Sequence, residues 1–335
     1  MRAAVFQGLG RPLVVETLPD PTPGEGQVVL KVGRCGICGS DLHMTEDPMF
    51  GVPLGAVLGH EMAGEVAAVG RGVERLRVGD LVSVMPVRGC GRCASCLAGE
   101  PAWCREMALE GGGYSEFAVT SERQCVVLPR SASLADGAIV EPLAVALHGV
   151  ILSEMKPGDA VVVLGAGPIG LATAFWARRM GAGRVVVTDI SRHQEERAFA
   201  MGATDFIADR EDVVGQVDRL LGRKADVVFE CVGLPGLIAQ AVDHARVKGT
   251  VLIMGLCTQP DTFVPFTALS KELRLQTAAF FKAQEYRSAL DALDSGAAEP
   301  RALVTETISL AALPETFEAL RRRTHQCKVL VAPHA

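Results

Sequence analysis

The chain has 335 residues, of which 49% are hydrophobic and 21% charged, and its formal net charge is -6. These values are typical of a soluble globular protein, and a chain of this length is expected to fold as two domains. No block of Lys and Arg is dense enough to track phosphates, which argues against a nucleic-acid partner. The N-terminal sequence lacks the pattern of a signal peptide, and no uninterrupted apolar run reaches the roughly 20 residues of a membrane span. We therefore expect a cytoplasmic protein without a membrane partner.

The N-terminal part of the chain has the pattern of short strands. Apolar runs up to Leu30 alternate with turns, and a Pro- and Gly-rich loop at 19–26 precedes a strand-like run at 28–32. The polar segment Cys35-Gly-Ile-Cys-Gly-Ser-Asp-Leu-His follows, and its C-x-x-C spacing is also typical of redox pairs and zinc ribbons. A ribbon needs a second C-x-x-C pair, and the nearest one belongs to another cluster. We therefore interpret Cys35 as a metal ligand and Cys38 as a buried thiol.

An imidazole and a carboxylate stand side by side at His60 and Glu61, in the segment G-H-E-M-A-G-E-V-A-A-V-G-R-G-V. Both side chains are ordinary zinc ligands. Adjacent residues of a regular strand point to opposite faces, so this pair can share a metal only if the backbone bends there. Cys35 offers a further ligand, as does Glu141 in a helical pattern at 133–151. With the nucleotide-binding pattern described below, these residues indicate a zinc site that faces a nicotinamide cofactor.

Four of the ten cysteines gather in the stretch C-G-R-C-A-S-C-L-A-G-E-P-A-W-C. In a chain without an export signal, such a cluster favours metal ligation over disulfides. Four thiolates this close can complete a tetrahedral shell around zinc, and the glycines at 89, 91 and 99 allow the backbone to fold around the metal. A complete shell has no open position, so the lobe 89–105 predicts a structural zinc. Its ligands are Cys90, Cys93, Cys96 and Cys104.

A dinucleotide-binding pattern follows a turn at 156–159. The apolar run 160–164 predicts a buried strand, which leads into G-A-G-P-I-G and then into a helix of small residues. The glycines permit a tight turn, a close approach of the backbone to pyrophosphate, and close helix packing. The phosphates are expected at the helix N-terminus, where amides and the helix dipole favour anions. The predicted cofactor-binding residues are Gly165, Gly167, Pro168, Ile169, Gly170 and Asp189.

The predicted strand 184–189 ends in a carboxylate, Asp189. An acid at this position accepts hydrogen bonds from the adenosine ribose hydroxyls and repels a 2′-phosphate, which favours NAD over NADP. Arg192 lies three residues further on, and we interpret it as a solvated loop charge. Further strands at 225–230 and 249–254, with helical connections, continue the alternating pattern of a parallel sheet.

In their order along the chain these motifs resemble the zinc-dependent medium-chain dehydrogenase/reductase family, which includes alcohol, sorbitol and threonine dehydrogenases. The resemblance rests on G-I-C-G-S-D-L-H, G-H-E-x-x-G-x-x-x-x-x-G-x-x-V, the four-cysteine lobe, E-P-L and G-x-G-x-x-G, and it covers nearly the whole chain. It implies an α/β protein with a GroES-like, β-rich catalytic zinc domain at 1–145 and 282–335. A Rossmann domain with a doubly wound parallel sheet is expected at 146–281. The family also implies a homodimer or a homotetramer.

The resemblance implies roles for the candidate metal ligands. Cys35 and His60 match the two constant ligands of the catalytic zinc, and Glu61 matches a carboxylate that binds the metal in sorbitol-type members. Glu141 stands where alcohol dehydrogenases often have a third cysteine. Whether Glu61 or Glu141 completes the shell stays open, and one position must remain free for water or substrate. Two zincs per chain are expected, one catalytic and one structural.

The resemblance also implies the reaction, a hydride transfer between an alcohol and NAD that gives the ketone. Ser40 matches a hydroxyl that hydrogen-bonds the substrate oxygen, and His43 matches a later member of the proton relay. Glu61 is a carboxylate that can also move protons. Two other classes fit less well: a zinc-free NADPH quinone reductase lacks the His-Glu pair, and a zinc-ribbon binding module leaves G-A-G-P-I-G unexplained.

Three apolar residues bear on the substrate. Sorbitol-type relatives carry an Arg-Tyr pair after the last strand of the nucleotide domain, where this chain has Phe280 and Phe281. The position after the relay histidine, commonly aromatic and polar in those enzymes, is Met44. Met and Phe form apolar walls without hydroxyl recognition. We therefore expect a secondary alcohol with an apolar or cyclic body, with a polyol or L-threonine as the alternatives.

Overall fold

The computed structural model describes all residues from 1 to 335, and the chain forms two units. Unit 1 contains Met1–Glu141, Lys282–Ala297 and Val304–Ala335, and unit 2 contains Pro142–Phe281 and Ala298–Leu303. The expected boundaries were 145/146 and 281/282, with 298–303 in the first domain. That short segment belongs with unit 2 because it packs against two helices of unit 2, with Pro300 and Leu303 buried.

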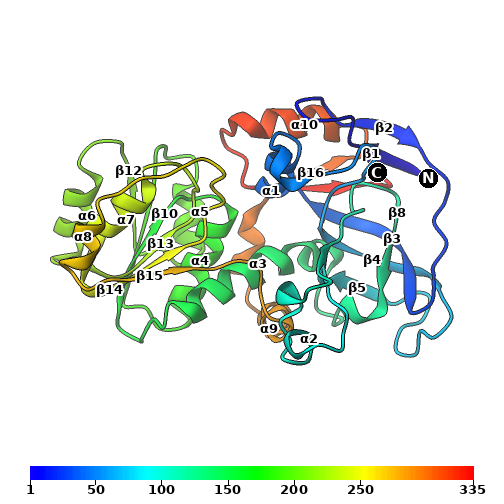
Figure 1. Cartoon of the computed structure of the whole chain (residues 1–335), viewed down its shortest axis with the longest axis horizontal. Coiled ribbons are helices and arrows are strands. Elements are labelled where there is room, and N and C mark those ends of the chain that lie inside the picture. Colours follow the sequence, from blue (N-terminus) through cyan, green and yellow to red (C-terminus); the bar gives the residue numbers. More distant parts are fainter. The chain divides into compact units, whose positions relative to one another are not determined.

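Unit 1 is built mainly of strands (Figure 1). Its strands are β1 (Arg2–Val5), β2 (Val14–Thr17), β3 (Gln27–Gly36), β4 (Glu61–Val69), β5 (Leu81–Val84), β6 (Val87–Arg88), β7 (Ala108–Leu109), β8 (Phe117–Ser121), β9 (Cys125–Val127), β16 (Val304–Ser309) and β17 (Lys328–Ala332). Its helices are α1 (Gly39–Met44), η1 (Pro48–Phe50), α2 (Ala94–Leu97), η2 (Pro101–Trp103), η3 (Glu122–Gln124), α9 (Ala283–Asp294), α10 (Leu313–Ala319) and η5 (Leu320–Arg322). Seven strands form one sheet in the order β16-β17-β3-β4-β5-β9, with β8 also paired to β3.

The strand β3 organises unit 1, since it pairs with β4, β8 and β17. Along its first part Val28, Leu30 and Val32 point into the hydrophobic core, with the period of two that a strand imposes. The register with β4 then shifts between Val32 and Arg34. Such a bulge reverses which residues face the core, and Cys35 joins the same core.

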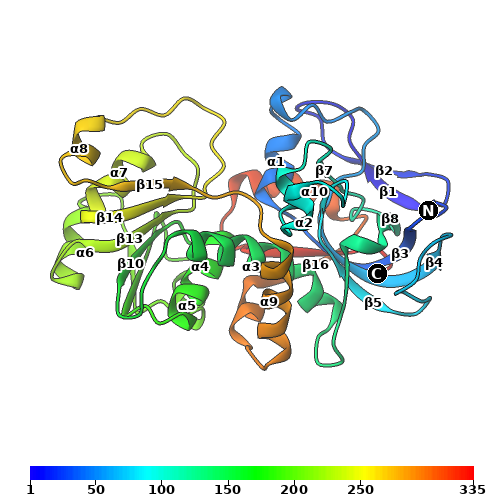
Figure 2. The same ribbon diagram turned by 60° about the horizontal axis from the view of Figure 1, so that its bottom comes forward.

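Unit 2 is an α/β layer structure, as predicted. Its strands are β10 (Ala160–Leu164), β11 (Arg184–Asp189), β12 (Asp205–Ala208), β13 (Ala225–Glu230), β14 (Ala245–Ile253) and β15 (Arg274–Thr277). Its helices are α4 (Pro168–Arg179), α5 (Glu195–Ala200), α6 (Val213–Leu221), α7 (Leu237–His244), α8 (Pro265–Leu269) and η4 (Glu299–Leu303). All neighbouring strands are parallel, in the order β12-β11-β10-β13-β14-β15. This is the doubly wound order of dinucleotide-binding domains, with helices on both faces of the sheet (Figure 2).

The helix α3 (Leu134–Leu152) runs across the boundary between the two units, which falls at Glu141/Pro142. Pro142 lies inside the helix, where it removes one backbone hydrogen bond. By length and composition α3 could cross a membrane, but 78% of its apolar window is buried inside the protein. That burial is typical of the core helix of a soluble protein, and His148 on this helix is buried as well.

Candidate active site and metal centres

Three potential zinc ligands come together in unit 1. The ligand atoms of Cys38, His60 and Glu61 all lie within 4.8 Å of one another. Cys38 is the N-cap of α1, and Glu61 is the first residue of β4. Because His60 precedes the strand, the alternation that separates neighbouring side chains does not apply to the His60–Glu61 pair. A thiol, an imidazole and a carboxylate form a donor set that suits zinc and leaves a fourth position open.

Cys35, the ligand predicted from the sequence, does not join this cluster, and Cys38 stands there with His60 and Glu61. The bulge in β3 turns Cys35 into the hydrophobic core, where it is fully buried. Its thiol lies 3.6 Å from the carbonyl oxygen of Gly36. Burial raises the pKa of the Cys35 thiol well above its usual value. Cys38 lies beyond the end of β3, so the strand does not direct its side chain into the hydrophobic core.

His60 is oriented by a buried carboxylate. Its Nδ1 lies 3.2 Å from Oδ1 of Asp41, and the Tyr114 hydroxyl donates to Oδ2 of Asp41 at 2.6 Å. Burial alone would raise the pKa of Asp41, but the neighbouring His60 lowers it. Burial would likewise lower the pKa of His60, and Asp41 raises it. A carboxylate on Nδ1 fixes the ring and leaves Nε2 for a metal.

Glu61 carries the clearest sign that a cation belongs in the cluster. Its Oε1 accepts a hydrogen bond of 2.6 Å from Nζ of Lys328, on β17. Its Oε2 is buried and has no hydrogen-bond partner. A buried carboxylate oxygen without a partner is costly, and a metal ion beside Cys38 and His60 would satisfy it. The residues of the cluster therefore fit zinc.

The other predicted residues of this site lie around the cluster. The Ser40 hydroxyl donates to Sγ of Cys38 at 3.2 Å, and His43 follows one turn later on α1. Glu141 is buried on α3 and is not one of the three clustered ligands. Burial raises the pKa of Glu141 to about 7, with further effects from the charges of His60 and Glu61.

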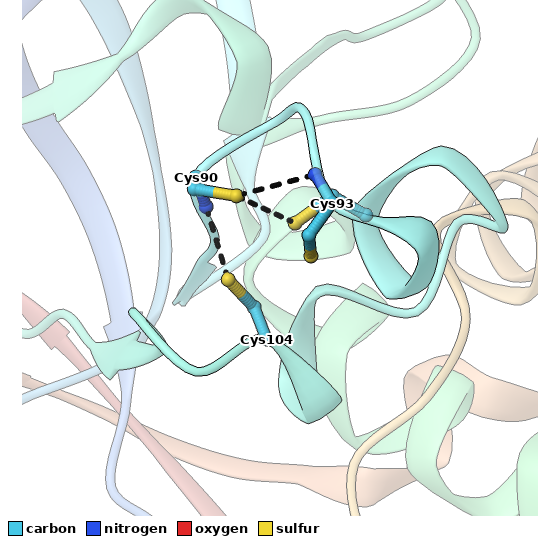
Figure 3. A group of neighbouring side chains, drawn as sticks. Cys90, Cys93 and Cys104 are labelled. Atoms are coloured by element: carbon cyan, nitrogen blue, oxygen red, sulfur yellow. Dashed lines mark hydrogen bonds between the residues drawn. The ribbon is translucent and has the colours of Figure 1, made fainter.

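The four cysteines of the lobe also meet, with their sulfur atoms within 4.8 Å of one another. Figure 3 shows Cys90, Cys93 and Cys104 around one small space. Backbone N–H groups point at the sulfurs: Cys93 donates to Sγ of Cys90 at 3.4 Å, and Cys90 donates to Sγ of Cys104 at 3.3 Å. Gly91, between the first two cysteines, has a φ of 75°, a conformation that favours glycine. The lobe fits a zinc ion with a closed shell.

The predicted dinucleotide loop joins β10 to α4. A side chain at Gly170 would place a Cβ 1.9 Å from the carbonyl oxygen of Gly165, so only glycine fits there. Gly167 is the N-cap of α4, and Pro168 and Ile169 form its first turn. Asp189 ends β11, and its Oδ2 accepts the N–H of Ala166 in the loop at 2.9 Å. Its Oδ1 accepts the N–H of Ser191 at 3.2 Å, so both oxygens of this carboxylate contact backbone amides near the loop.

The structure does not gather the predicted substrate residues within either unit. Met44 belongs to unit 1, where it packs against the hydrophobic core. Phe280 and Phe281 end the long segment of unit 2, and Phe281 is buried. Phe280 has a φ of 61°, which is rare for a residue other than glycine.

Three contributors to the metal cluster were not assigned to it from the sequence: Cys38, Tyr114 and Lys328. A signal for Cys38 was present, because it directly precedes the polar run Gly-Ser-Asp at the end of a strand. A signal for Lys328 was also present, because a lysine that opens the apolar run Val-Leu-Val-Ala needs a buried partner. Tyr114 had no such signal, since its partner Asp41 is 73 residues away in the chain.

Family models match both parts of the chain. The model described as alcohol dehydrogenase GroES-like domain matches residues 24–130, and the model described as zinc-binding dehydrogenase matches residues 168–295. Sorbitol dehydrogenase of Bacillus subtilis is 33% identical over 347 aligned residues, covering 100% of this chain and 98% of the relative. The (R,R)-butanediol dehydrogenase of the same organism is 33% identical over 96% of both chains.

Solved structures are similar over the whole chain. The 2R,3R-butanediol dehydrogenase of Bacillus subtilis has a TM-score of 0.88 at 30% identity, with 99% of both chains covered. The alcohol dehydrogenase rspB of E. coli, complexed with NADH, has a TM-score of 0.90 at 29% identity and the same coverage. A dehydrogenase of the zinc-binding type from Sinorhizobium meliloti, bound to NADP, has a TM-score of 0.89 at 33% identity and covers 99% of both chains.

These matches confirm the predicted fold class, the predicted cofactors zinc and a nicotinamide dinucleotide, and an alcohol or polyol oxidoreductase. A zinc-ribbon module without catalysis is not favoured, since the similarity covers the nucleotide unit as well. The chain belongs to the zinc-dependent medium-chain dehydrogenase/reductase family.

Proposed function

We propose that the chain oxidises a secondary alcohol to the ketone and transfers the hydride to NAD. The observation that carries the proposal is the cluster of Cys38, His60 and Glu61, with a buried carboxylate oxygen left without a partner. The same chain carries the dinucleotide loop between β10 and α4. A site of this composition leaves one position for an alcohol oxygen.

Cys38, His60 and Glu61 would hold the catalytic zinc, and Cys90, Cys93, Cys96 and Cys104 a structural zinc. When bound, the catalytic zinc supplies a Lewis acid that makes an alcohol proton easier to remove. Glu61 is the ligand that the cluster favours, because Glu141 is not one of the clustered residues. Asp41 would accept the Nδ1–H of His60 and so keep the ring oriented with Nε2 toward the metal.

Ser40 and His43 carry the substrate proton away from the site. The Ser40 hydroxyl contacts Sγ of Cys38, so it lies within reach of an oxygen beside that ligand. It accepts the alcohol proton and passes its own onward. His43, three residues later, shares a face of α1 with Ser40, and an imidazole exchanges protons near neutral pH.

The preference for NAD over NADP rests on Asp189 and is supported by Arg192. The Arg192 guanidinium contacts both carboxylate oxygens of Glu195, at 2.7 and 2.9 Å, so a neighbouring negative charge already accompanies it. Exchange of Asp189 for Ala should lower kcat/KM with NAD roughly 10- to 100-fold, since it removes hydrogen bonds from a charged acceptor. Kinetics with both cofactors measure this change. An unchanged ratio between NAD and NADP would contradict the assignment.

We infer a substrate with an apolar or cyclic body from Met44, Phe280 and Phe281. The unusual φ of Phe280 supports a functional position, because such strain gathers at ligand sites. A polyol or a small vicinal diol is the second candidate, and the sorbitol and butanediol dehydrogenases among the relatives favour it.

A substrate panel tests the proposed function. Purified, zinc-loaded protein is given NAD and a series of secondary alcohols, from sorbitol and 2,3-butanediol to cyclic terpenoid alcohols, and NADH formation is followed by absorbance. We expect the highest kcat/KM with the apolar members. His60→Ala is the matched inactive control. If the protein binds two zincs but oxidises none of the alcohols, the proposed function is wrong.

We also propose that the chain is a cytoplasmic homo-oligomer joined through unit 2. The strand β15 is an outer strand of its sheet, and exposed apolar side chains lie on β15 and on α8: Leu275, Phe266 and Leu269. An exposed edge with apolar neighbours favours pairing with a second copy. Light scattering after chromatography measures the mass, and Leu275→Lys should shift it toward the monomer.

A further inference from the structure

We propose that Lys328 is a positioning residue of the catalytic metal centre. Its ammonium holds one oxygen of Glu61, so that the other oxygen stays directed at the metal and Glu61 remains a ligand. The inference rests on the proposed function, since it takes Cys38, His60 and Glu61 as the zinc ligands.

Lys328 and Glu61 form an ion pair that is closed to solvent. Nζ of Lys328 lies 2.6 Å from Oε1 of Glu61, and the two side chains are 2% and 0% exposed. The ammonium also donates to the carbonyl oxygen of Ile37 at 3.1 Å. Ile37 directly precedes Cys38, so one buried charge contacts both segments that supply metal ligands.

The strand β3 confines the second oxygen of Glu61. Gly36 pairs with Glu61 across the sheet, and a Cβ at Gly36 would lie 2.0 Å from Oε2 of Glu61. The space that Oε2 of Glu61 occupies beside β3 therefore exists only because residue 36 is glycine. Oε1 is held by Lys328, and Oε2 occupies the space beside Gly36 that a side chain would fill.

The two buried charges depend on each other. Removing one partner of a buried ion pair leaves an uncompensated charge, which is strongly unfavourable. A carboxylate without Lys328 would therefore turn away from its present orientation, and this change weakens its bond to a metal. Mutation of a residue that contacts and orients a metal ligand typically lowers metal affinity roughly 10- to 100-fold.

A purely structural role would predict a different result. If Lys328 only ties β17 to β3 through Ile37, its loss lowers stability and leaves the zinc affinity of the folded protein unchanged. Metal affinity therefore separates the two roles, and it is measured without turnover.

The test compares Lys328→Met with the native chain and with Lys31→Met, a matched control at an exposed position of β3. Zinc is titrated in competition with a coloured chelator, and the visible spectrum of the cobalt-substituted protein is recorded. We expect Lys328→Met to weaken one of the two metal sites roughly 10- to 100-fold and to shift its cobalt spectrum. The four-cysteine site and the Lys31→Met control should keep the native values.

A double-mutant cycle keeps the inference testable if Lys328→Met folds poorly. Glu61→Gln removes the buried carboxylate charge. The double variant Glu61→Gln/Lys328→Met removes the buried carboxylate charge and the buried ammonium charge together. If Lys328 acts through Glu61, the double variant binds zinc as tightly as Glu61→Gln. A further loss of affinity in the double variant, or a native affinity in Lys328→Met, would overturn the inference.

The outcomes also separate this inference from the proposed function. A native chain that oxidises no alcohol, but whose zinc affinity falls in Lys328→Met, refutes the proposed function and supports the role of Lys328. A native chain that loads only the four-cysteine lobe refutes both.

Discussion

The two metal clusters of unit 1 are assembled in different ways. The four-cysteine lobe takes all its ligands from one short loop, and backbone N–H groups of the same loop support the sulfurs. The cluster of Cys38, His60 and Glu61 takes its ligands from two segments. Asp41, which accepts a hydrogen bond from Tyr114, orients His60, and Lys328 holds Glu61. A site of the first kind is specified by local spacing, whereas a site of the second kind is specified by the packing of the whole unit.

The difference extends to the chemistry of the two sites. A shell of four thiolates is complete and stabilises a fold, whereas three mixed ligands leave a position for a reacting oxygen. The second kind of site must also hold buried charges in place, and each of them needs a partner.

The largest expected effect concerns the identity of the catalytic cysteine. Cys38→Ala should lower kcat/KM by about 1000-fold or more, because it removes a ligand of the Lewis acid that activates the alcohol. Cys35→Ala is the matched control and should keep the activity and both zincs. Steady-state kinetics and metal analysis check both variants, and loss of the catalytic zinc from Cys35→Ala alone would reverse the assignment.

A mutation in the four-cysteine lobe should lower the stability of the protein and leave kcat unchanged. Cys93→Ala removes one thiolate of the closed shell, and we expect a loss on the order of 3 kcal/mol in the free energy of unfolding, or a Tm lower by roughly 6 to 12 °C. Calorimetry measures the change. The remaining folded protein should retain kcat, and a selective loss of kcat at unchanged Tm would contradict the division between the two sites.

A smaller effect is expected from the outer support of His60. Tyr114→Phe removes the hydrogen bond to Oδ2 of Asp41, while the contact of Asp41 with His60 remains. Zinc affinity of the catalytic site should fall roughly tenfold, as measured by chelator competition. Tyr286→Phe, also buried in unit 1, serves as the control because its hydroxyl bonds to Ser83 and Val84 and not to Asp41.

The smallest effect is a difference in thiol reactivity after zinc is removed. Backbone N–H groups of Arg92 and Cys93 lower the pKa of Cys90 to about 6, whereas desolvation raises that of Cys96 to about 12. Since the thiolate is the reactive form, alkylation of Cys90 should rise as the pH increases through about 6, and Cys96 should react last. Mass spectrometry of the alkylated peptides gives the order, and equal rates at pH 7 would contradict it.

Much of the fold and of the four-cysteine lobe could be predicted from the sequence, because residues close together in the chain determine them. The G-A-G-P-I-G turn, the acid at Asp189 and the spacing of the four cysteines each follow from local geometry. The choice between Cys35 and Cys38 does not, because it depends on a bulge that reverses the faces of β3. The register shift lies at Gly33, and a glycine inside a strand pattern is compatible with a bulge, but the sequence does not fix which residues face the core after it.

Two further features also depend on packing that the sequence does not reveal: the boundary between the units and the choice between Glu61 and Glu141 as the ligand. Residues 298–303 lie with unit 2 because their buried side chains pack against it, which their sequence does not reveal. Glu61 and Glu141 are equally plausible ligands in the sequence, and only the placement of β4 and α3 separates them.

The pairing of Glu61 with Lys328 has a consequence for biogenesis. The two residues are 267 positions apart, and the whole nucleotide unit is synthesised between them. Glu61 therefore gains its counterion only when β17 pairs with β3, whereas the four thiols of the lobe come from one short stretch of chain. A nascent or truncated chain that lacks β17 would carry a complete four-cysteine lobe and a buried carboxylate without its ammonium partner.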